Sequence, residues 1–517
     1  MRYLNMMLGK ISKFPWLPLL FTIYAPLALL AHNLGQVEIQ SGYRSLLLSA
    51  TGALLFLVIL GNLLRDWQKA GLIVTLLAIL FFTYGRVYDV IKNVQIAGFI
   101  IGRHRYLAPI WLGLASLGVG WILKKIKYPS SLMNTLNIMS LILLAFPLMQ
   151  TARFELLNSN NQPTSSPESP YQTSLPADRT LPDVYYVILD GYGRSDILLK
   201  NFNYDNSAFI DQLRQQGFYV ATCSQSNYSK TDLSLASSLN FNYLDVLGDE
   251  FTPENTDRSP LWRLIKNSAV AAELKKMGYR IVAFETGFDF TQLANTDFFY
   301  FSPRRGFNEF ESLLLKTSLA VILDDAGLFR KYHLTVEDRK RDNISYILAK
   351  LVELPALPGP KFVFAHLVIP HQPFVIGPNG EPVVVRKSGS TDAGYYTDID
   401  YVNGYRDQAI YISNQIIPVV TRIVRDSRTP PVIIIQGDHG PSHFDEADRI
   451  GILNAYLFPQ AHPGFYSTIT PVNTFRLVFN TYFETQFDLL KDVTYYSTYP
   501  YAYQYQEILN ECKGDGK

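Results

Sequence analysis

The chain has 517 residues, which is more than one ordinary domain holds and predicts at least two structural units. Its net charge of +1 gives no reason to expect nucleic acid as a partner, and its 48 % of hydrophobic residues suits a mixture of membrane spans and a soluble domain. Two cysteines, Cys223 and Cys512, are too few for a disulfide scaffold or a cysteine-built zinc site. We expect both thiols to be unpaired, although the sequence leaves their pairing open.

Long apolar stretches are confined to the first 150 residues. Each has about the length that crosses roughly 30 Å of hydrocarbon as a helix. A cleaved signal peptide would explain one such stretch but not the whole set, and a buried soluble helix is a weaker alternative for segments separated by short polar loops. We therefore predict five transmembrane helices, at 14–34, 45–64, 70–88, 106–123 and 132–150.

Basic residues predict how these helices are oriented, because short cytoplasmic loops carry an excess of Lys and Arg. They occur before the first span and in the second and fourth loops: Arg2, Lys10, Lys13, Arg65, Lys69, Lys124, Lys125 and Lys127. An odd number of spans then places the rest of the chain outside the cytoplasm, which predicts a multi-pass protein of the cell membrane. The third loop disagrees, since it carries Arg86, Lys92, Arg103 and Arg105. Either these residues contact lipid phosphates at the membrane surface, or one span is miscounted.

The composition changes abruptly at about residue 158, where a polar, proline-rich stretch begins. We predict a transmembrane domain at 1–150, a linker at 151–181 and a catalytic domain at 182–517. Short apolar runs at 183–189, 280–284, 362–369 and 431–436 are typical of buried strands. Helical patterns lie at 207–215, 260–277, 337–353 and 404–426. This alternation predicts an α/β domain with a mostly parallel central sheet and helices on both faces.

Residues that can carry chemistry stand just after three of these predicted strands, where α/β sheets bind their ligands. Asp190 ends the first, His371 follows the third, and Asp438 and His439 follow the fourth. Carboxylate and imidazole groups at such a rim can bind a divalent cation. The alternative for each is a turn residue or a surface histidine. His366 lies inside its strand and is the more probable structural histidine of the pair.

A hydroxyl-rich segment at 227–240 precedes a plausible helix. A hydroxyl at a helix N-terminus meets free backbone N–H groups and the positive end of the helix dipole, which favours an alkoxide and a phosphate bound to it. From composition alone, an ordinary helix-capping residue is the better interpretation.

The order of these motifs resembles the alkaline phosphatase/sulfatase superfamily. The membrane spans and linker narrow the resemblance to the lipoteichoic acid synthase and phosphoethanolamine transferase group, over nearly the whole chain. Lys230-Thr231-Asp232 is similar to the Lys-Thr-Ser-Asp run of the synthases, and Thr231-x-x-Ser234-Leu235 to the Thr-x-x-Ser-Leu of the transferases. The resemblance implies Thr231 as the nucleophile. It implies a metal site formed by Asp190, Thr231, Asp438 and His439, and a substrate-binding role for Lys230 and His371. His371 would also be catalytic, by stabilising charge on the phosphoryl oxygens or by protonating the leaving group.

The chain also departs from the family pattern. Formylglycine sulfatases mature a Cys or Ser within Cys/Ser-x-Pro/Ala-x-Arg, and Cys223-Ser224-Gln225-Ser226-Asn227 lacks both the Pro/Ala and the Arg. The paired cysteines common in phosphoethanolamine transferases are absent. His443 stands near a position where Glu is common and is a weak candidate ligand for a second metal ion.

The resemblance implies one divalent metal ion, zinc or manganese, and transfer of a phospho head group from a membrane lipid phosphodiester to a glycan, lipid or polymer acceptor. Two alternatives remain open: a hydrolase of the same superfamily, acting as phosphodiesterase or phosphatase and less readily as sulfatase, and a non-catalytic membrane protein. The sequence does not reveal the donor, the acceptor or the oligomeric state.

Overall fold

The computed structural model describes residues 14–34, 37–96, 99–160, 181–304, 306–383, 398–459, 464–498 and 500–512. The chain divides into two compact units. One comprises Met1–Asn161 with Gly306–Val336, and the other Gln162–Arg305 with Glu337–Lys517. We call them the membrane unit and the α/β unit.

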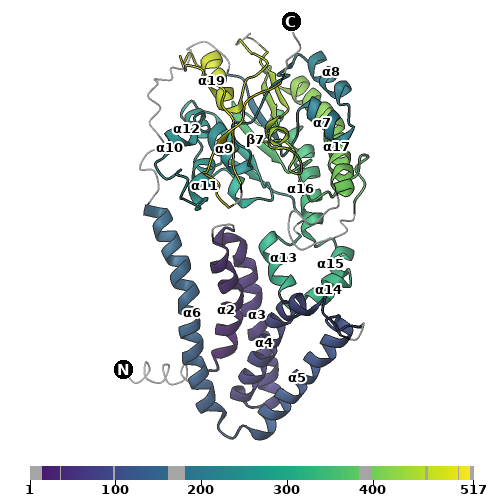
Figure 1. Cartoon of the computed structure of the whole chain (residues 1–517). Coiled ribbons are helices and arrows are strands. Elements are labelled where there is room, and N and C mark those ends of the chain that lie inside the picture. The colour runs from purple at the N-terminus through teal and green to yellow at the C-terminus, as the bar shows by residue number, and fades with distance from the viewer. Residues whose placement is uncertain are drawn as a thin grey trace, which may run out of the picture. The chain divides into compact units, whose positions relative to one another are not determined.

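A helix occupies each of the five predicted spans (Figure 1). They are α2 (Leu17–His32), α3 (Tyr43–Leu64), α4 (Trp67–Ile91), α5 (His104–Lys125) and α6 (Pro129–Asn160). Within the described residues, four helices are long and apolar enough to cross a membrane, and α2, with 16 residues, is shorter. At 1.5 Å per residue α2 is about 24 Å long, less than the roughly 30 Å of hydrocarbon. The prediction of five full-length spans is therefore corrected to four, with one short apolar helix.

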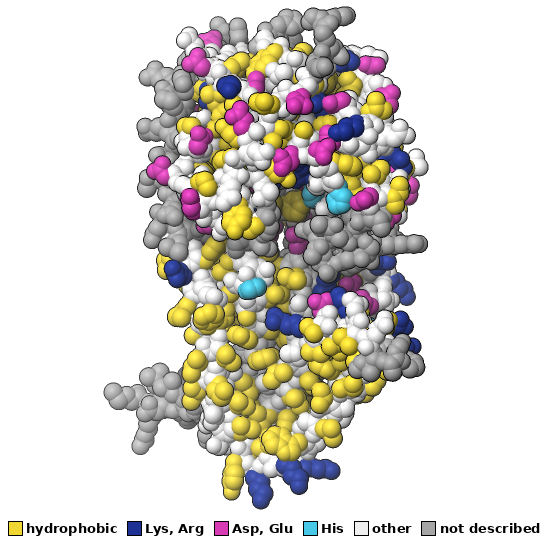
Figure 2. Space-filling model, in the orientation of Figure 1, with side chains coloured by type: hydrophobic (Ala, Val, Ile, Leu, Met, Phe, Trp, Pro, Cys, Tyr) yellow, Lys and Arg dark blue, Asp and Glu magenta, His cyan; other side chains and the backbone are white. Residues whose placement is uncertain are grey.

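The surface of these helices is apolar, as it is on proteins that lipid surrounds (Figure 2). Exposed side chains include Leu55, Phe56, Leu112, Leu117, Ile142 and Phe146. The four long helices are thus compatible in length and surface with a membrane protein.

The membrane unit also contains a later segment, which we call the insert (306–336), and which the sequence did not predict there. It forms α13 (Glu309–Lys316), α14 (Val321–Asp325) and α15 (Leu328–Lys331). Phe310 packs with Leu30 in a buried cluster, and Glu311 forms an ion pair with Arg44. These helices are too short for a clear hydrophobic period, so only their tertiary contacts reveal the association.

In the α/β unit, the described residues form a seven-stranded sheet in the order β4-β9-β8-β3-β7-β5-β6. The strands are β3 (Val184–Leu189), β4 (Tyr219–Val220), β5 (Arg280–Phe284), β6 (Phe298–Tyr300), β7 (Lys361–Leu367), β8 (Val432–Gln436) and β9 (Asn454–Leu457). The five strands from β8 to β6 are parallel, whereas β9 is antiparallel to both its neighbours. The sheet is therefore mixed, and the predicted mostly parallel arrangement describes its five-stranded part.

Helices cover both faces of this sheet. Its strands carry apolar side chains on both faces, so each face has to be buried beneath a layer of helices. On β3, Val184, Tyr186 and Ile188 face one core, and Tyr185, Val187 and Leu189 face the other. The first core includes α9 (Thr231–Ser238), α11 (Ser259–Lys266), α12 (Ala269–Lys276) and α19 (Pro471–Tyr482). The second includes α7 (Ser195–Phe202), α8 (Ser207–Gln215), α16 (Val336–Leu351) and α17 (Asp398–Asp426). The helix predicted at 260–277 is two helices, since Ser268 accepts a hydrogen bond from the N–H of Ala271 and caps α12.

The expectation of unpaired cysteines is wrong. Cys223 and Cys512 form a disulfide across 289 residues of sequence, with their Cα atoms 5.5 Å apart. The C-terminal tail makes this possible because it returns to the segment before α9. There β10 (Tyr495–Tyr496) pairs with β11 (Gln506–Glu507), and the ring of Tyr228 packs against Tyr495 and Tyr505. A separation this large leaves no local signal in the sequence.

Candidate metal centre

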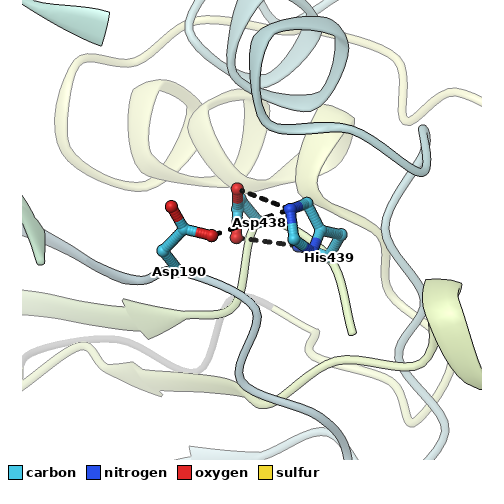
Figure 3. A group of neighbouring side chains, drawn as sticks. All are labelled: Asp190, Asp438 and His439. Atoms are coloured by element: carbon cyan, nitrogen blue, oxygen red, sulfur yellow. Dashed lines mark hydrogen bonds and ion pairs between the residues drawn. The ribbon is translucent and has the colours of Figure 1, made fainter. Parts of the chain in front are cut away.

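Three of the predicted site residues meet at the rim of the sheet. Asp190 follows β3, while Asp438 and His439 follow β8, the parallel neighbour of β3. One ligand atom of each lies within 4.8 Å of the others, and all three side chains are buried and point toward one another (Figure 3). Nε2 of His439 is 3.6 Å from Oδ1 of Asp190 and 3.5 Å from Oδ2 of Asp438. The structure thus brings together three of the four predicted metal ligands.

The glycines beside these residues are required by close backbone packing. A Cβ atom on Gly437 would lie 2.4 Å from the carbonyl oxygen of Tyr192, and one on Gly440 would lie 2.3 Å from that of Asp448. Gly191 has φ of +74°, a conformation that favours glycine. Gly437 therefore lets the segment after β8 lie directly against the segment after β3, which places the two carboxylates together, and Gly440 allows close packing against α18 (Glu446–Ile450).

The carboxylates of Asp190 and Asp438 are incompletely hydrogen-bonded by the described residues. Asp438 Oδ1 accepts hydrogen bonds from the N–H groups of Gly191 and His439, at 2.9 and 3.0 Å. Oδ2 of Asp438 and both carboxylate oxygens of Asp190 are buried and accept no hydrogen bond of normal geometry from the described part of the chain. Burial, and then the charge of Asp190, raises the pKa of Asp438 to about 6. Burial opposes ionisation of Asp190 too, but His371, His366 and His439 outweigh it and hold its pKa below the usual value. A divalent cation would satisfy these oxygens, so the residues present fit a metal ion.

His439 is arranged as a neutral ligand. Its Nδ1–H donates to the carbonyl oxygen of Gly440 at 2.8 Å, which leaves the lone pair on Nε2 directed at the carboxylates. Burial, followed by the positive charge of Arg449, lowers the pKa of His439 to about 3. The imidazole is therefore unprotonated at neutral pH, as a metal ligand must be.

Thr231 reaches the same nitrogen. It is the first residue of α9, and its Oγ1 lies 3.1 Å from Nε2 of His439. Lys230, not Thr231, is the N-cap residue, and no side chain caps this helix. The capping interpretation therefore does not apply to Thr231. Thr231 is half-buried, whereas both aspartates are fully buried.

Lys230 and His371 stand beside this cluster. Lys230 is half-buried, and burial, then the charge of Arg258, lowers its pKa to about 8. The ring centroid of His371 is 6.1 Å from that of His439, and its Nδ1–H donates to the carbonyl oxygen of Gln372 at 2.6 Å. Burial lowers the pKa of His371 against the attraction of Asp190. His371 is a neighbour of the candidate metal site and not a member of its ligand group.

His366 has a more specific place than the structural role predicted for it. It is fully buried in β7, opposite Ile188, and its Nε2 lies 3.3 Å from Oδ2 of Asp190. Its Nδ1 lies 3.3 Å from the hydroxyl of Thr291. This imidazole thus stands behind Asp190, where it can hold the carboxylate in place. In the sequence it is one histidine in an apolar strand, and only the register with β3 shows what it faces.

Arg449 also contacts the cluster, and sequence reasoning does not single it out. It lies near the end of α18 (Glu446–Ile450), and its Nη2 is 3.3 Å from Nε2 of His439. No motif marks a single arginine in a helix as short as this one. By contrast, His443, the candidate for a second metal ion, stacks on the ring of Tyr401 with centroids 4.4 Å apart. Within the described residues it does not belong to the ligand group of Asp190, Asp438 and His439.

The fold and the site define a protein with apolar, membrane-length helices and an α/β unit that carries a candidate metal centre. No protein-family model and no curated protein matches the chain. It is similar to solved structures of phosphoethanolamine transferases, of a lipoteichoic acid synthase and of a sulfatase.

The zinc complex of the periplasmic domain of EptC from Escherichia coli has a TM-score of 0.43 at 11 % identity, over 67 % of this chain and 97 % of that one. The lipooligosaccharide phosphoethanolamine transferase EptA from Neisseria meningitidis has a TM-score of 0.37 at 14 % identity, over 89 % and 93 %. The lipoteichoic acid synthase LtaP from Listeria monocytogenes has a TM-score of 0.36 at 14 % identity, over 60 % and 75 %. Likenesses this distant do not fix an activity, which has to be inferred from the chain's own residues.

Proposed function

We propose that the chain is a membrane-anchored, metal-dependent enzyme that transfers a phospho head group from a lipid phosphodiester by way of Thr231. The observation that carries this proposal is the position of the Thr231 hydroxyl, 3.1 Å from Nε2 of His439, which forms one cluster with two buried aspartates. A nucleophilic hydroxyl needs such surroundings because it is weak at its ordinary pKa.

Asp190, Asp438 and His439 would hold the metal ion, with the Thr231 oxygen as a further ligand. Two carboxylates and one imidazole suit zinc or manganese. The bound cation would supply positive charge that favours the alkoxide form of Thr231 and offsets charge on the phosphoryl oxygens.

The chain's own residues then perform two displacements. In the first, the Thr231 oxygen bonds to phosphorus, the bond from phosphorus to the lipid alcohol breaks, and phospho-threonine forms. His371 takes the proton of Thr231 on Nε2, because its Nδ1–H is already bonded to Gln372, and passes that proton to the leaving oxygen. In the second, the oxygen of an acceptor hydroxyl bonds to phosphorus, the bond from phosphorus to the Thr231 oxygen breaks, and the acceptor's proton returns to Thr231. Lys230 contributes positive charge beside the group being transferred.

A hydrolase is the second candidate, with water as the acceptor. Dependence of product release on an added alcohol separates the two. Sulfatase activity that requires a matured Cys223 is disfavoured, because Cys223 is in a disulfide.

We infer that the α/β unit lies outside the cytoplasm, whether or not the short helix α2 crosses the membrane. The basic loops after α3 and α5 are cytoplasmic by the positive-inside rule, so α6 must end on the other side. In this arrangement the third loop is basic but external. The ends of the helices that flank this loop contact the acidic side chain of Asp325 in the insert: Nε2 of His104 and the hydroxyl of Tyr88 each lie 2.9 Å from its Oδ2. A disulfide persists mainly in oxidising compartments, which agrees with this side.

The test is head-group release from vesicles of a lipid phosphodiester by the purified full chain, with and without an alcohol acceptor. Thr231→Ala should abolish release, whereas the control Ser237→Ala, whose hydroxyl bonds to Asn242 within the same helix region, should retain it. Activity in Thr231→Ala would remove Thr231 as the nucleophile. Loss of activity in both variants would point to unfolding of α9 instead.

A further inference from the structure

Arg449 is a cation held next to the candidate metal centre. Its Nε donates to the carbonyl oxygen of Ser229 at 2.8 Å, and its Nη1 donates to that of Gly440 at 3.2 Å and to the hydroxyl of Ser442. These oxygens are neutral, and Arg449 has no ion-pair partner among the described residues. The guanidinium is thus fixed in position while its charge is left without a carboxylate of its own.

The remaining guanidinium nitrogen of Arg449, Nη2, lies beside the proposed metal ligands and nucleophile. Nη2 lies 3.3 Å from Nε2 of His439, and the Thr231 hydroxyl lies 3.1 Å from that same nitrogen. If His439 gives this lone pair to a metal ion, Nη2 loses its acceptor and stands beside a second positive charge. Asp190 and Asp438 would then be neutralised by the metal, so an anion from outside is what this arrangement lacks.

We propose that Arg449 is a catalytic residue whose Nη2 donates to a non-bridging oxygen of the phosphoryl group that Thr231 attacks. This inference rests on the proposed function. A phosphoryl group bound through phosphorus to Thr231 must hold its other oxygens within a few bond lengths of Oγ1, and Nη2 is close to this position because it shares Nε2 of His439 with Oγ1 as a neighbour. Arg449 takes up part of the charge on those oxygens during the displacement, in addition to the positive charge that a bound metal ion would supply. Because Ser229 and Gly440 already fix Arg449 in position, it needs no rearrangement.

The competing explanation is that Arg449 only ties the loop before α9 to the loop after β8. The chain offers a matched control for such a tie. Arg194 donates through Nη1 to the carbonyl oxygen of Ser224 at 3.1 Å, in the same loop, but its guanidinium is paired with Asp196. Substitution of Arg194 removes a contact with this loop, but it removes no unpaired positive charge from the candidate metal centre.

The experiment measures binding of inorganic phosphate to the zinc-loaded full chain by titration calorimetry, together with the zinc content of each variant. Arg449→Met should keep its zinc and bind phosphate about tenfold to a hundredfold more weakly, because a hydrogen bond to a charged group is lost. Arg449→Lys should fall between this variant and the wild type, since it keeps the charge but not the fork of donors. Arg194→Met should bind phosphate as the wild type does.

Each outcome decides between the explanations. Wild-type affinity for phosphate in zinc-loaded Arg449→Met would overturn the role of Arg449 and leave the proposed function standing. An equal loss in Arg194→Met would overturn it as well, since a loop tie would then suffice. If Arg449→Met does not fold or bind zinc, Arg449→Lys decides in the same way. A wild-type protein that binds zinc but no phosphate would refute the proposed function, and the role of Arg449 with it.

Discussion

Metal binding at this site should weaken as the pH falls through about 6. Because the pKa of Asp438 is raised to about 6, a proton competes with a metal ion for this carboxylate at a pH where an ordinary aspartate is ionised. Asp190 and His439 do not compete in this range, since the pKa of each is lowered, that of His439 to about 3. Among the three ligands, it is therefore the protonation of Asp438 that sets the pH dependence of affinity between pH 7 and pH 5.

The expected size follows from this one proton. Affinity should be nearly constant above pH 7 and about tenfold weaker at pH 5, a loss of about 1.4 kcal/mol. The metal-free protein should show the opposite trend. Its folded state binds the proton of Asp438 more tightly than the unfolded chain does. That contribution to stability is complete below the ordinary aspartate pKa and is lost as the pH rises through about 6. The gain in melting temperature on adding metal should therefore grow between pH 5 and pH 7.

The assay is calorimetric titration of the metal-free chain with Zn²⁺ at several pH values, with melting curves in parallel. His439→Gln should bind more weakly but keep the midpoint near pH 6, whereas Asp438→Asn should lose the pH dependence. A midpoint that disappears in His439→Gln and persists in Asp438→Asn would show that the imidazole titrates and would refute this reasoning.

Three further changes test separate parts of the structure. His366→Gln should weaken zinc binding about tenfold, because outer contacts hold metal-binding carboxylates such as Asp190 in place; unchanged affinity would return His366 to a purely structural role. Gly437→Ala should lower the free energy of unfolding by about 1 to 3 kcal/mol, since its Cβ would meet the Tyr192 carbonyl oxygen at 2.4 Å; an unaltered melting curve would contradict that contact. Cys512→Ser should lower stability by about 2 to 5 kcal/mol, and the unreduced wild type should show no thiol that reacts with an alkylating reagent; a labelled thiol would contradict the disulfide.

The strands that carry the site could be predicted because their sequence signal is local. The apolar runs that end at Asp190 and before Asp438 are buried on both faces. Nearly all of their residues are therefore apolar, and this is visible in the sequence. β4, β6 and β9 were missed because two to four residues are too few to show a period. The membrane helices were predictable for the same reason as the long strands, and α2 was overestimated because its apolar run is longer than its helix.

The contacts that distinguish a catalytic residue from an ordinary one are not local. The composition around Thr231 predicts an ordinary helix cap, and only the distance between Thr231 and His439 indicates another role. His366 and Arg449 carry no pattern at all, since what they face depends on strand register and on a loop that returns from β8. The resemblance to a known family could supply Thr231 because its flanking residues match a motif, and it could not supply Arg449, which stands outside every motif quoted.

The position of Thr231 depends on segments from the far end of the chain. The carbonyl oxygen of Asn227 accepts a hydrogen bond from the N–H of Tyr495 at 2.9 Å, and the hydroxyl of Ser229 accepts one from the N–H of Ser497 at 3.2 Å. The disulfide joins the start of this same loop to the end of the tail. The C-terminal tail is therefore hydrogen-bonded along the loop that ends at the proposed nucleophile. Changes in the tail should reduce turnover through the position of Thr231 while the buried aspartates keep their places, because the tail bonds to this loop and the aspartates directly follow strands β3 and β8.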